Sequence, residues 1–353
     1  QLQQLQHTTT IYLTQPSVDL AERLEEAMPG GLRRTFFVNS GSEANEGALL
    51  LARMYTGRKG FIALESGLHG RTNLTMSVTG LPMWRTDKYL DHDVEFIPRP
   101  YHPDLSLEEA ASLSLESLER VLEEKGNSIA AMIVEPIQGN GGMIMPTRAY
   151  FRDVKALLER YGVLLIADEI QTGFGRTGKM FAMEHFDVVP DIISMAKALG
   201  NGIPVAAFAT TDEIALALNR PSASTFGGNP VSAATALAVL DYIRDERLPE
   251  RSVQLGERLK AGLKTLQARY PSLMVDVRGT GLMLGAELTG VDSEGAAALT
   301  DQVLEAMKDR GYLIGKNGIG RNVLAFQPPM IITEEDIDGM LNVLNEVLAE
   351  LNH

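Results

Sequence analysis

Two charged residues at the ends of apolar runs carry the chemistry that this sequence suggests. Lys197 follows the apolar run 192–195 and precedes a glycine-containing turn, while Asp168 ends a second run, 163–167. An amine partly withdrawn from solvent loses its proton more readily, and it can then form a Schiff base with a carbonyl. A lysine for an aldehyde and a carboxylate for a pyridinium nitrogen are the parts that a pyridoxal 5′-phosphate (PLP) enzyme requires.

Small and polar residues in three other segments could bind the same ligand. The segment 39–42 lies between a predicted strand and a predicted helix, where backbone N–H groups and the helix N-terminus favour a phosphate. Gln171 could donate a hydrogen bond to a phenolate oxygen, and Ile170 could form an apolar floor under a ring. Thr225 could donate its hydroxyl to a phosphate from a loop that enters a helix at Pro230.

Each of these residues also has a purely structural interpretation. The segment 39–42 with Glu43 fits an ordinary helix cap, and Asp168 could cap a helix after its strand. Thr225 fits a plain helix-entry turn. Glu135 ends another buried run, which suits an acid facing a substrate or cofactor but also a cap for the next segment. Taken singly, these positions leave both interpretations open.

Other reaction classes find less support. The segment 173–178 matches G-x-G-x-x-G, but Asp168 and Glu169 separate it from the strand and would repel a pyrophosphate. No acidic residue lies ~20 positions further on to bind a ribose. No cluster has metal-ligand spacing, so no metal is expected, and His69 and His185 are expected to make local hydrogen bonds. Acyl transfer has no G-x-S-x-G motif as its anchor.

The composition of the chain limits the kinds of partner and the cell compartment that can be expected. The net charge of −14 and the lack of a basic cluster argue against nucleic acid. The absence of cysteine excludes disulfides, thiolate metal sites and cysteine nucleophiles, and it leaves the redox compartment undetermined. No apolar stretch reaches the ~18 residues that span a bilayer, and no signal-peptide pattern is seen, so the default prediction is a cytoplasmic protein without membrane contact. The sequence starts at Gln1, so residues could precede it.

Apolar runs alternate with helical patterns, which predicts an α/β fold with a mainly parallel sheet covered on both faces. The length of 353 residues suits a large domain, 1–245, that binds the cofactor and a smaller α+β domain, 246–353. The predicted strands are 34–38, 60–64, 130–135, 163–167, 192–195, 205–209, 274–277, 282–287 and 322–326, and the predicted helices are 16–28, 43–55, 148–161 and 231–247.

Six ordered motifs together resemble those of the class III (omega) aminotransferases, a fold-type I PLP family. They are Asn39-Ser-Gly-Ser-Glu-Ala-Asn45, His69-Gly-Arg71, Val134-Glu-Pro136, Asp168-Glu-Ile-Gln-Thr-Gly173, Lys197 and Thr225-Phe-Gly-Gly-Asn-Pro230. The resemblance covers nearly the whole chain, and the segments 195–204 and 225–230 are most similar to the alanine–glyoxylate aminotransferase 2 branch. It implies a mainly parallel seven-stranded sheet flanked by helices, plus a smaller C-terminal α+β domain.

The resemblance assigns roles to particular residues. It makes Lys197 the Schiff-base lysine, which moves a proton between Cα and C4′, and it pairs Asp168 with the pyridinium nitrogen. Gln171 would contact the phenolic oxygen, and Thr225 would reach the phosphate of a neighbouring subunit, which implies a homodimer with shared sites. The other residues implied to bind the cofactor are Gly41, Ser42, Leu68, His69 and Ile170.

The sequence departs from the family's pattern at three places. Leu68 stands where an aromatic residue usually stacks on the pyridine ring, so ~0.5–1.5 kcal/mol of aromatic stacking is absent. Ala325 stands where many members use an arginine to bind an α-carboxylate, a strong bidentate contact. Arg321 lies nearby and could substitute. Members also carry several tens of residues before the position of Gln1, in a segment that helps to line the substrate pocket.

The expected function is PLP-dependent transamination by a ping-pong mechanism. The donor is an amino acid, an ω-amino acid or an amine, and the acceptor is a keto acid such as pyruvate or glyoxylate. Glu135 and Arg321 are the candidate substrate-binding residues. Two alternatives stay open: another PLP reaction on the same scaffold (racemisation, aminomutation or decarboxylation), or a PLP-binding protein of little activity.

Overall fold

A computed structural model describes residues 1–90 and 93–352, and the chain in it divides into two units. The first unit comprises residues 1–136, 146–174 and 179–246. The second comprises residues 137–145, 175–178 and the chain from Arg247 onward. Two short segments that precede residue 245 therefore make their contacts within the second unit.

The first unit is built on a seven-stranded sheet with the order β1-β7-β6-β5-β4-β2-β3. Neighbouring strands run parallel except at β7, which is antiparallel to both of its neighbours. The predicted mainly parallel sheet is therefore confirmed. The strands are β1 (Arg34–Val38), β2 (Gly60–Leu64), β3 (Val94–Ile97), β4 (Ile129–Val134), β5 (Leu164–Asp168), β6 (Ile192–Met195) and β7 (Ala206–Thr210).

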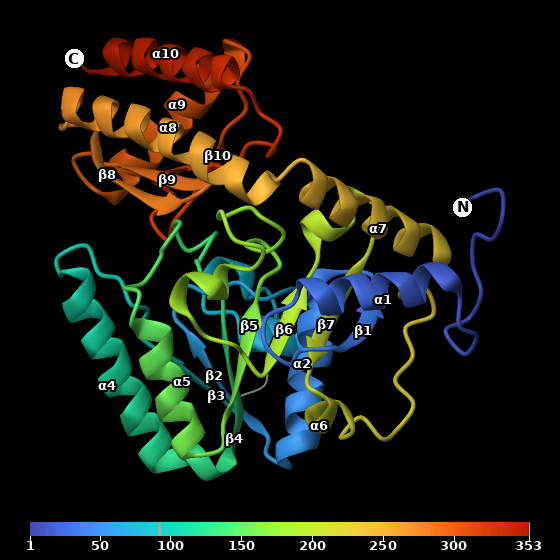
Figure 1. Cartoon of the computed structure of the whole chain (residues 1–353). Helices are drawn as coiled ribbons and strands as arrows, with labels where there is room; N and C mark the ends of the chain where they lie inside the picture. Colours follow the sequence, from blue (N-terminus) through green and yellow to red (C-terminus); the bar gives the residue numbers. More distant parts are fainter. Residues whose placement is uncertain (91–92, 353) are drawn as a thin grey trace. The chain divides into compact units, whose positions relative to one another are not determined.

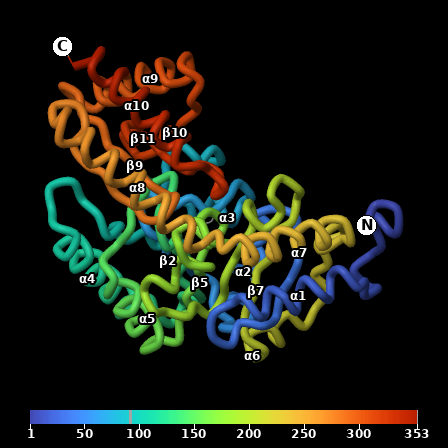
Figure 2. The backbone as a smooth tube through the Cα atoms, turned by 45° about the horizontal axis from the view of Figure 1, so that its top comes forward, coloured from blue at the N-terminus to red at the C-terminus, as the bar shows by residue number. Residues whose placement is uncertain are grey.

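Helices cover this sheet because its inner strands are buried at every residue and need apolar partners on both faces. Ala48, Leu49 and Ala52 of α2 pack on one face, α4 and α5 pack against each other, and α1 lies beside α7 (Figures 1 and 2). The helices are α1 (Gln15–Ala27), α2 (Gly41–Thr56), α3 (Asn73–Ser77), α4 (Leu107–Lys125), α5 (Tyr150–Arg160), α6 (Asp212–Ala215) and α7 (Pro230–Asp245).

The start of α2 matters most for the site. Ser40 caps the helix by accepting a hydrogen bond from Glu43 N, and the Glu43 carboxylate accepts one from Ser40 N in return. This capping box starts the helix at Gly41, two residues before the predicted start. Gly41 and Ser42 therefore belong to the first helical turn.

The second unit has a four-stranded antiparallel sheet with the order β10-β11-β9-β8. Its strands are β8 (Met274–Thr280), β9 (Met283–Leu288), β10 (Gly315–Asn317) and β11 (Val323–Phe326), and its helices are α8 (Leu248–Arg269), α9 (Ser293–Asp309) and α10 (Glu334–Leu351). Side chains from all three helices form one core with Val277, Leu284, Leu324 and Phe326 of the sheet. No helix in the described part of the chain is long and apolar enough to cross a membrane.

Candidate active site

The carboxyl ends of five strands lie along one edge of the seven-stranded sheet. β2, β4, β5 and β6 run parallel, and β1 shares their direction because β1 and β6 both pair antiparallel with β7. Every predicted cofactor residue except Thr225 lies at the end of one of these strands or in the segment that follows it. The structure therefore brings these residues to one edge, where open α/β sheets bind ligands.

The Asp168 carboxylate lies at the centre of this edge and is 3% exposed. Its Oδ2 accepts a hydrogen bond from Asn45 Nδ2 at 2.7 Å and lies 2.8 Å from His69 Nδ1. Its Oδ1 accepts a hydrogen bond from Ile170 N at 3.1 Å. A buried carboxylate needs such donors to offset its lost hydration. Asp168 is thus held as a hydrogen-bond acceptor and is more than a strand-end cap.

His69 is tied to this carboxylate, as the sequence prediction of a local hydrogen-bonding role allowed. Its Nδ1 carries a hydrogen if it donates to Asp168, and its backbone N donates to Thr79 Oγ1 at 3.0 Å. The Nε2 atom is buried and has no hydrogen-bond partner among residues 1–90 and 93–352. Within the same residues, no group of three or more His, Asp or Glu side chains is placed to hold a metal ion.

Gln171 contributes a second unsatisfied atom. Its Oε1 is buried without a hydrogen-bond partner in the described chain. The oxygen and nitrogen of an amide can be exchanged by a flip of the group, so this side chain can turn its nitrogen toward an acceptor. Buried polar atoms of this kind are expected where a ligand completes the bonding.

Small residues surround the first turn of α2. The amides of Gly41 and Ser42 precede the first intrahelical hydrogen bond, so both face the positive end of the helix without a helix carbonyl to bind. A Cβ atom on Gly41 would lie 2.8 Å from Ile170 Cδ1, and one on Gly70 would lie 2.7 Å from Ser42 Oγ. Only glycine fits at these two positions. They leave the backbone accessible, as an anion site requires.

These features fit PLP. A buried carboxylate suits a pyridinium nitrogen, an unsatisfied amide suits a phenolic oxygen, and a helix N-terminus lined by glycine suits a phosphate. All three come from the same sheet edge.

A hydrogen bond connects the backbone of Leu68 to the side chain of Glu135. Leu68 N donates a hydrogen bond to Glu135 Oε1 at 2.8 Å, and Glu135 is 6% exposed. Glu135 therefore anchors the segment that carries Leu68 and His69, in addition to any contact with a ligand. Leu68 itself is partly exposed at the edge of the sheet.

Lys197 lies two residues beyond β6 and begins a short 3₁₀ turn, Lys197–Leu199. Ser194, three residues earlier, is the register partner of Asp168, so both segments leave the sheet at the same level. Lys197 has a φ of 38°, a region that side-chain-bearing residues seldom adopt and that recurs at functional sites. Lys197 itself is exposed in the chain.

Thr225 lies in the loop before α7 and is exposed. The neighbouring residue Ser224 accepts a hydrogen bond through its Oγ from Asn39 Nδ2 at 2.9 Å, which ties this loop to the segment after β1.

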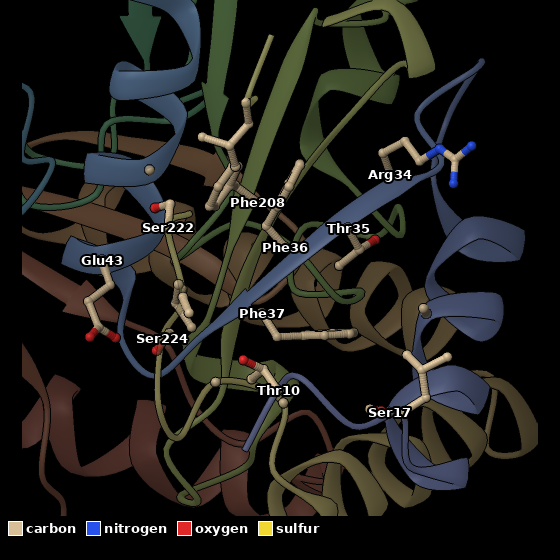
Figure 3. A pocket seen from close by; sticks show the side chains of 18 of the residues that line it. Thr10, Ser17, Arg34, Thr35, Phe36, Phe37, Glu43, Phe208, Ser222 and Ser224 are labelled. Atoms are coloured by element: carbon tan, nitrogen blue, oxygen red, sulfur yellow. The ribbon is translucent and has the colours of Figure 1, made fainter. Parts of the chain in front are cut away.

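A separate cavity of about 790 Å³ lies beside β1 (Figure 3). The side chains around it include Thr10, Ser17, Phe37, Glu43 and Ser224, from the N-terminal segment, α1, β1, α2 and the loop before α7. None of the residues predicted to bind PLP or substrate lines it within the described chain. This cavity is therefore not the centre of the chemistry.

The glycine-rich segment 173–178 forms turns rather than the start of a helix. A dinucleotide fingerprint requires its glycines to open a helix directly after a strand. The structure therefore agrees with the rejection of that motif.

Ala325 lies in β11 of the second unit, paired with Gly315 of β10 and Gly285 of β9. Its methyl group belongs to an apolar cluster with Ile137, Met143 and Met283. Arg321 is exposed in the preceding turn with a φ of 55°, and its backbone N donates to Gly318 O at 3.1 Å.

Sequence reasoning missed three side chains near Asp168. Asn45 and Ser194 are buried in its hydrogen-bond network. Ser194 is a polar residue within the apolar run 192–195, which was the available signal, whereas Asn45 lies among small and polar residues that gave no such signal. Glu169 is buried as well: burial raises the pKa of its carboxyl to about 7, although Thr172 and the backbone N of Met183 donate to it.

Comparison with known proteins agrees with this geometry. Residues 1–348 match the family of class III aminotransferases. The chain is 38% identical to alanine–glyoxylate aminotransferase 2 homolog 2 of Arabidopsis thaliana, over 99% of this chain and 74% of that protein. It is 39% identical to acetylornithine aminotransferase of Methanothermobacter thermautotrophicus, over 99% of this chain and 83% of that protein.

Solved structures give the same result. A transaminase from the marine bacterium Virgibacillus superposes with a TM-score of 0.93 at 30% identity, covering 100% of this chain and 83% of its own. An amine transaminase from an uncultivated Pseudomonas species, solved with PLP bound, superposes with a TM-score of 0.91 at 30% identity, covering 99% and 84%. The chain therefore belongs to the class III aminotransferases, which use PLP to transfer amino groups to keto acids.

Proposed function

We propose that Lys197 is the lysine that binds PLP covalently and that Asp168 is the partner of its pyridinium nitrogen. The observation that carries this assignment is the buried Asp168 carboxylate, held by three donors at the strand edge that Lys197 also joins. When bound, PLP supplies an electron sink that weakens the bonds to the donor's Cα.

The residues of the chain supply the rest of the chemistry. Lys197 Nζ takes the proton from the donor's Cα, a role that its place outside the sheet supports. Asp168 keeps a negative charge next to the ring nitrogen. Gln171 orients the phenolic oxygen, and Leu68 packs on the ring as an aliphatic lid held in place by Glu135.

The phosphate end is assigned to Gly41 and Ser42, together with Thr225 of a second copy. Thr225 is exposed in a loop tied to the segment after β1, so it is free to reach another subunit. A homodimer with shared sites follows from this assignment.

The proposed amino donor is an ω-amino compound or an amine, and the acceptor is pyruvate or glyoxylate. The support is Ala325, whose methyl group lies in an apolar cluster where an arginine would be needed to bind an α-carboxylate. The name of one relative, acetylornithine aminotransferase, also refers to a substrate with an ω-amino group, and one similar structure is an amine transaminase. Glu135 and Arg321 remain the candidates for substrate contact.

A donor screen tests this proposal. The PLP-loaded protein is incubated with pyruvate or glyoxylate and a simple amine, an ω-amino acid, alanine or ornithine, and the keto or aldehyde product is quantified. With the amine and the ω-amino acid as donors, we expect one keto or aldehyde product for each amino acid formed from pyruvate or glyoxylate. Efficient use of alanine, or of the α-amino group of ornithine, with no turnover of amines would contradict the donor assignment.

Two further predictions from the sequence are kept as part of the proposal. One is the division into a cofactor-binding domain, 1–245, and a small domain, 246–353. The other is a cytoplasmic location.

A further inference from the structure

Four buried side chains form a connected hydrogen-bond network behind the proposed cofactor site. Ser194 Oγ donates to Asn45 Oδ1, and Asn45 Nδ2 donates both to Asp168 Oδ2 and to His69 O, each at 2.7 Å. Asn45 and Ser194 are 0% exposed, His69 is 2% and Asp168 is 3%. Three elements, α2, β5 and β6, are connected by this network.

The Asn45 amide has one favourable orientation. Its nitrogen faces Asp168 and the carbonyl of His69, which are both acceptors. The reversed amide would place an oxygen against a carboxylate and a carbonyl, and both contacts are repulsive. Ser194 holds the amide in this orientation by donating to Asn45 Oδ1 from the other side.

The two oxygens of Asp168 are used unequally as a result. Oδ2 receives Asn45 Nδ2 and His69 Nδ1, whereas within residues 1–90 and 93–352 Oδ1 receives only the backbone N of Ile170. A carboxylate oxygen accepts about two hydrogen bonds, so Oδ1 alone has acceptor capacity left. Oδ1 is therefore the oxygen available to a ring nitrogen.

Asn45 also links the two ends of the proposed cofactor site. It follows Gly41 by four residues on α2, which is about one helical turn. The first backbone N–H groups of α2 therefore face the proposed phosphate site. One turn later, the side-chain amide of Asn45 contacts Asp168, the proposed partner of the ring nitrogen. A rigid helix fixes the distance between these two groups.

We propose that Asn45 and Ser194 are positioning residues for PLP: Ser194 anchors the Asn45 amide, and Asn45 occupies Asp168 Oδ2 so that Oδ1 faces the pyridinium nitrogen. This inference rests on the proposed role of Asp168. It differs from the direct contacts of the site because neither residue is proposed to touch the cofactor.

The test measures PLP affinity and spectrum in addition to activity. Apo-protein of Ser194→Ala, Ser194→Thr, Asn45→Asp and Asp168→Asn is titrated with PLP, and the visible absorbance of each complex is followed against pH. Ser114→Ala is the matched control, because Ser114 is equally buried and its hydroxyl contacts Pro98 O and Tyr150 Oη away from the site.

We expect Ser194→Ala to raise the Kd for PLP about tenfold, the effect of losing one orienting hydrogen bond, and to shift the pH at which the absorbance changes. Asn45→Asp, which removes the donor and adds a charge, should have a larger effect. Ser194→Thr should stay within a few fold of the unaltered protein, and Ser114→Ala should lower the Tm without changing the Kd or the spectrum.

Three outcomes separate the possibilities. Unchanged affinity and unchanged pH response in both Ser194→Ala and Asn45→Asp, with a strong effect of Asp168→Asn, would overturn the positioning role alone. Equal losses in Ser194→Ala and Ser114→Ala would also overturn it, because the effect would then be one of stability. No effect of Asp168→Asn on PLP affinity would show that the proposed function itself is misassigned.

Discussion

The carboxyl-end edge of the large sheet and the face of the small sheet that carries Ala325 contrast in how much polar structure they contain. Around Asp168, three buried polar side chains and the backbone amide of Ile170 join one hydrogen-bond network with the carboxylate. Around Ala325, the residues are glycines on the paired strands and apolar side chains above them. The first region has a buried carboxylate with its donors, whereas the second has small and apolar side chains in a row that ends at a charged one, Arg278 of β8, the register partner of Gly285.

The proposed reaction and the proposed choice of amino donor therefore depend on different parts of the chain. A buried polar network is costly unless every member is satisfied, so it tolerates little change. A row of small and apolar residues such as Gly315, Ala325 and Gly285 can change one side chain at a time. Under the proposed assignments, the polar edge supplies the groups of the reaction, and Ala325 marks the position at which the donor specificity can change.

The largest effect is expected from Lys197→Ala. This change removes the amine that moves the proton at Cα, so transamination should fall by about 10⁴-fold. Formation of keto product in single-turnover and steady-state assays measures the loss. Lys179→Ala, at an exposed lysine, is the control and should retain full activity. Activity of Lys197→Ala near that of the control would show that the proton is moved by another group.

Asp168→Asn is expected to have the next largest effect. The variant keeps the shape of the side chain and removes the charge opposite the ring nitrogen, which should lower kcat by about 10²–10³-fold. His69 Nδ1 would also lose its carboxylate partner. Measurement of kcat and of the Kd for PLP in parallel checks this, and an unchanged kcat would place the charge that matters elsewhere.

Glu169→Gln tests a second buried carboxyl at the same strand end. Asp168 is proposed to act there as a carboxylate, whereas burial favours the neutral form of its neighbour Glu169. Burial raises the pKa of Glu169 to about 7 from 4.5, so the unfolded chain releases this proton at a lower pH than the folded protein does. The free energy of unfolding should therefore fall by up to about 3 kcal/mol as the pH rises from about 4.5 to about 7. Above that pH, Glu169 should cause no further change.

The glutamine variant stays neutral, so it should lack this decrease and be the more stable protein at pH 8. Urea unfolding at pH 5 and at pH 8 measures the difference. If the two proteins show equal slopes of stability against pH, Glu169 is already ionised in the folded chain.

Ala325→Arg tests the apolar region. An arginine offers a charged, bidentate contact to an α-carboxylate, so the ratio of kcat/KM for alanine over an amine should rise by about 10–100-fold. The new charge lies next to Met143 and Met283 and should lower the Tm. Ala325→Met adds bulk without charge and should not raise the ratio; an equal gain in both variants would exclude recognition of the carboxylate.

The sequence was sufficient for the inner strands of the large sheet, because these strands are apolar runs with polar residues directly after them. It did not reveal β3, β10 or α4. β3 and β10 are edge strands of four and three residues that are only partly buried, so they carry little hydrophobic signal. α4 has a mostly polar surface, with its buried positions occupied by small residues and leucines.

The network behind Asp168 could not be predicted because it depends on tertiary pairing. Ser194 meets Asn45 only because β6 pairs with β5 in one particular register while α2 packs over both strands. The exposure of Lys197 likewise depends on how the turn after β6 folds. Local patterns give the side of a strand on which a residue lies, but not the partner that it meets there.

The smallest effect is expected from Leu68→Phe. An aromatic ring over the cofactor would add stacking of about 0.5–1.5 kcal/mol, which corresponds to a gain of roughly 2–13-fold in PLP affinity. Leu68 N is held by Glu135, so the backbone should keep its place and the new ring should start from the same point as the leucine. Leu68→Met, of similar size and without a ring, is the control. Titration of both apo-proteins with PLP measures the difference, and weaker binding by the phenylalanine variant would mean that the site at this edge is shaped for an aliphatic side chain and has no room for a ring.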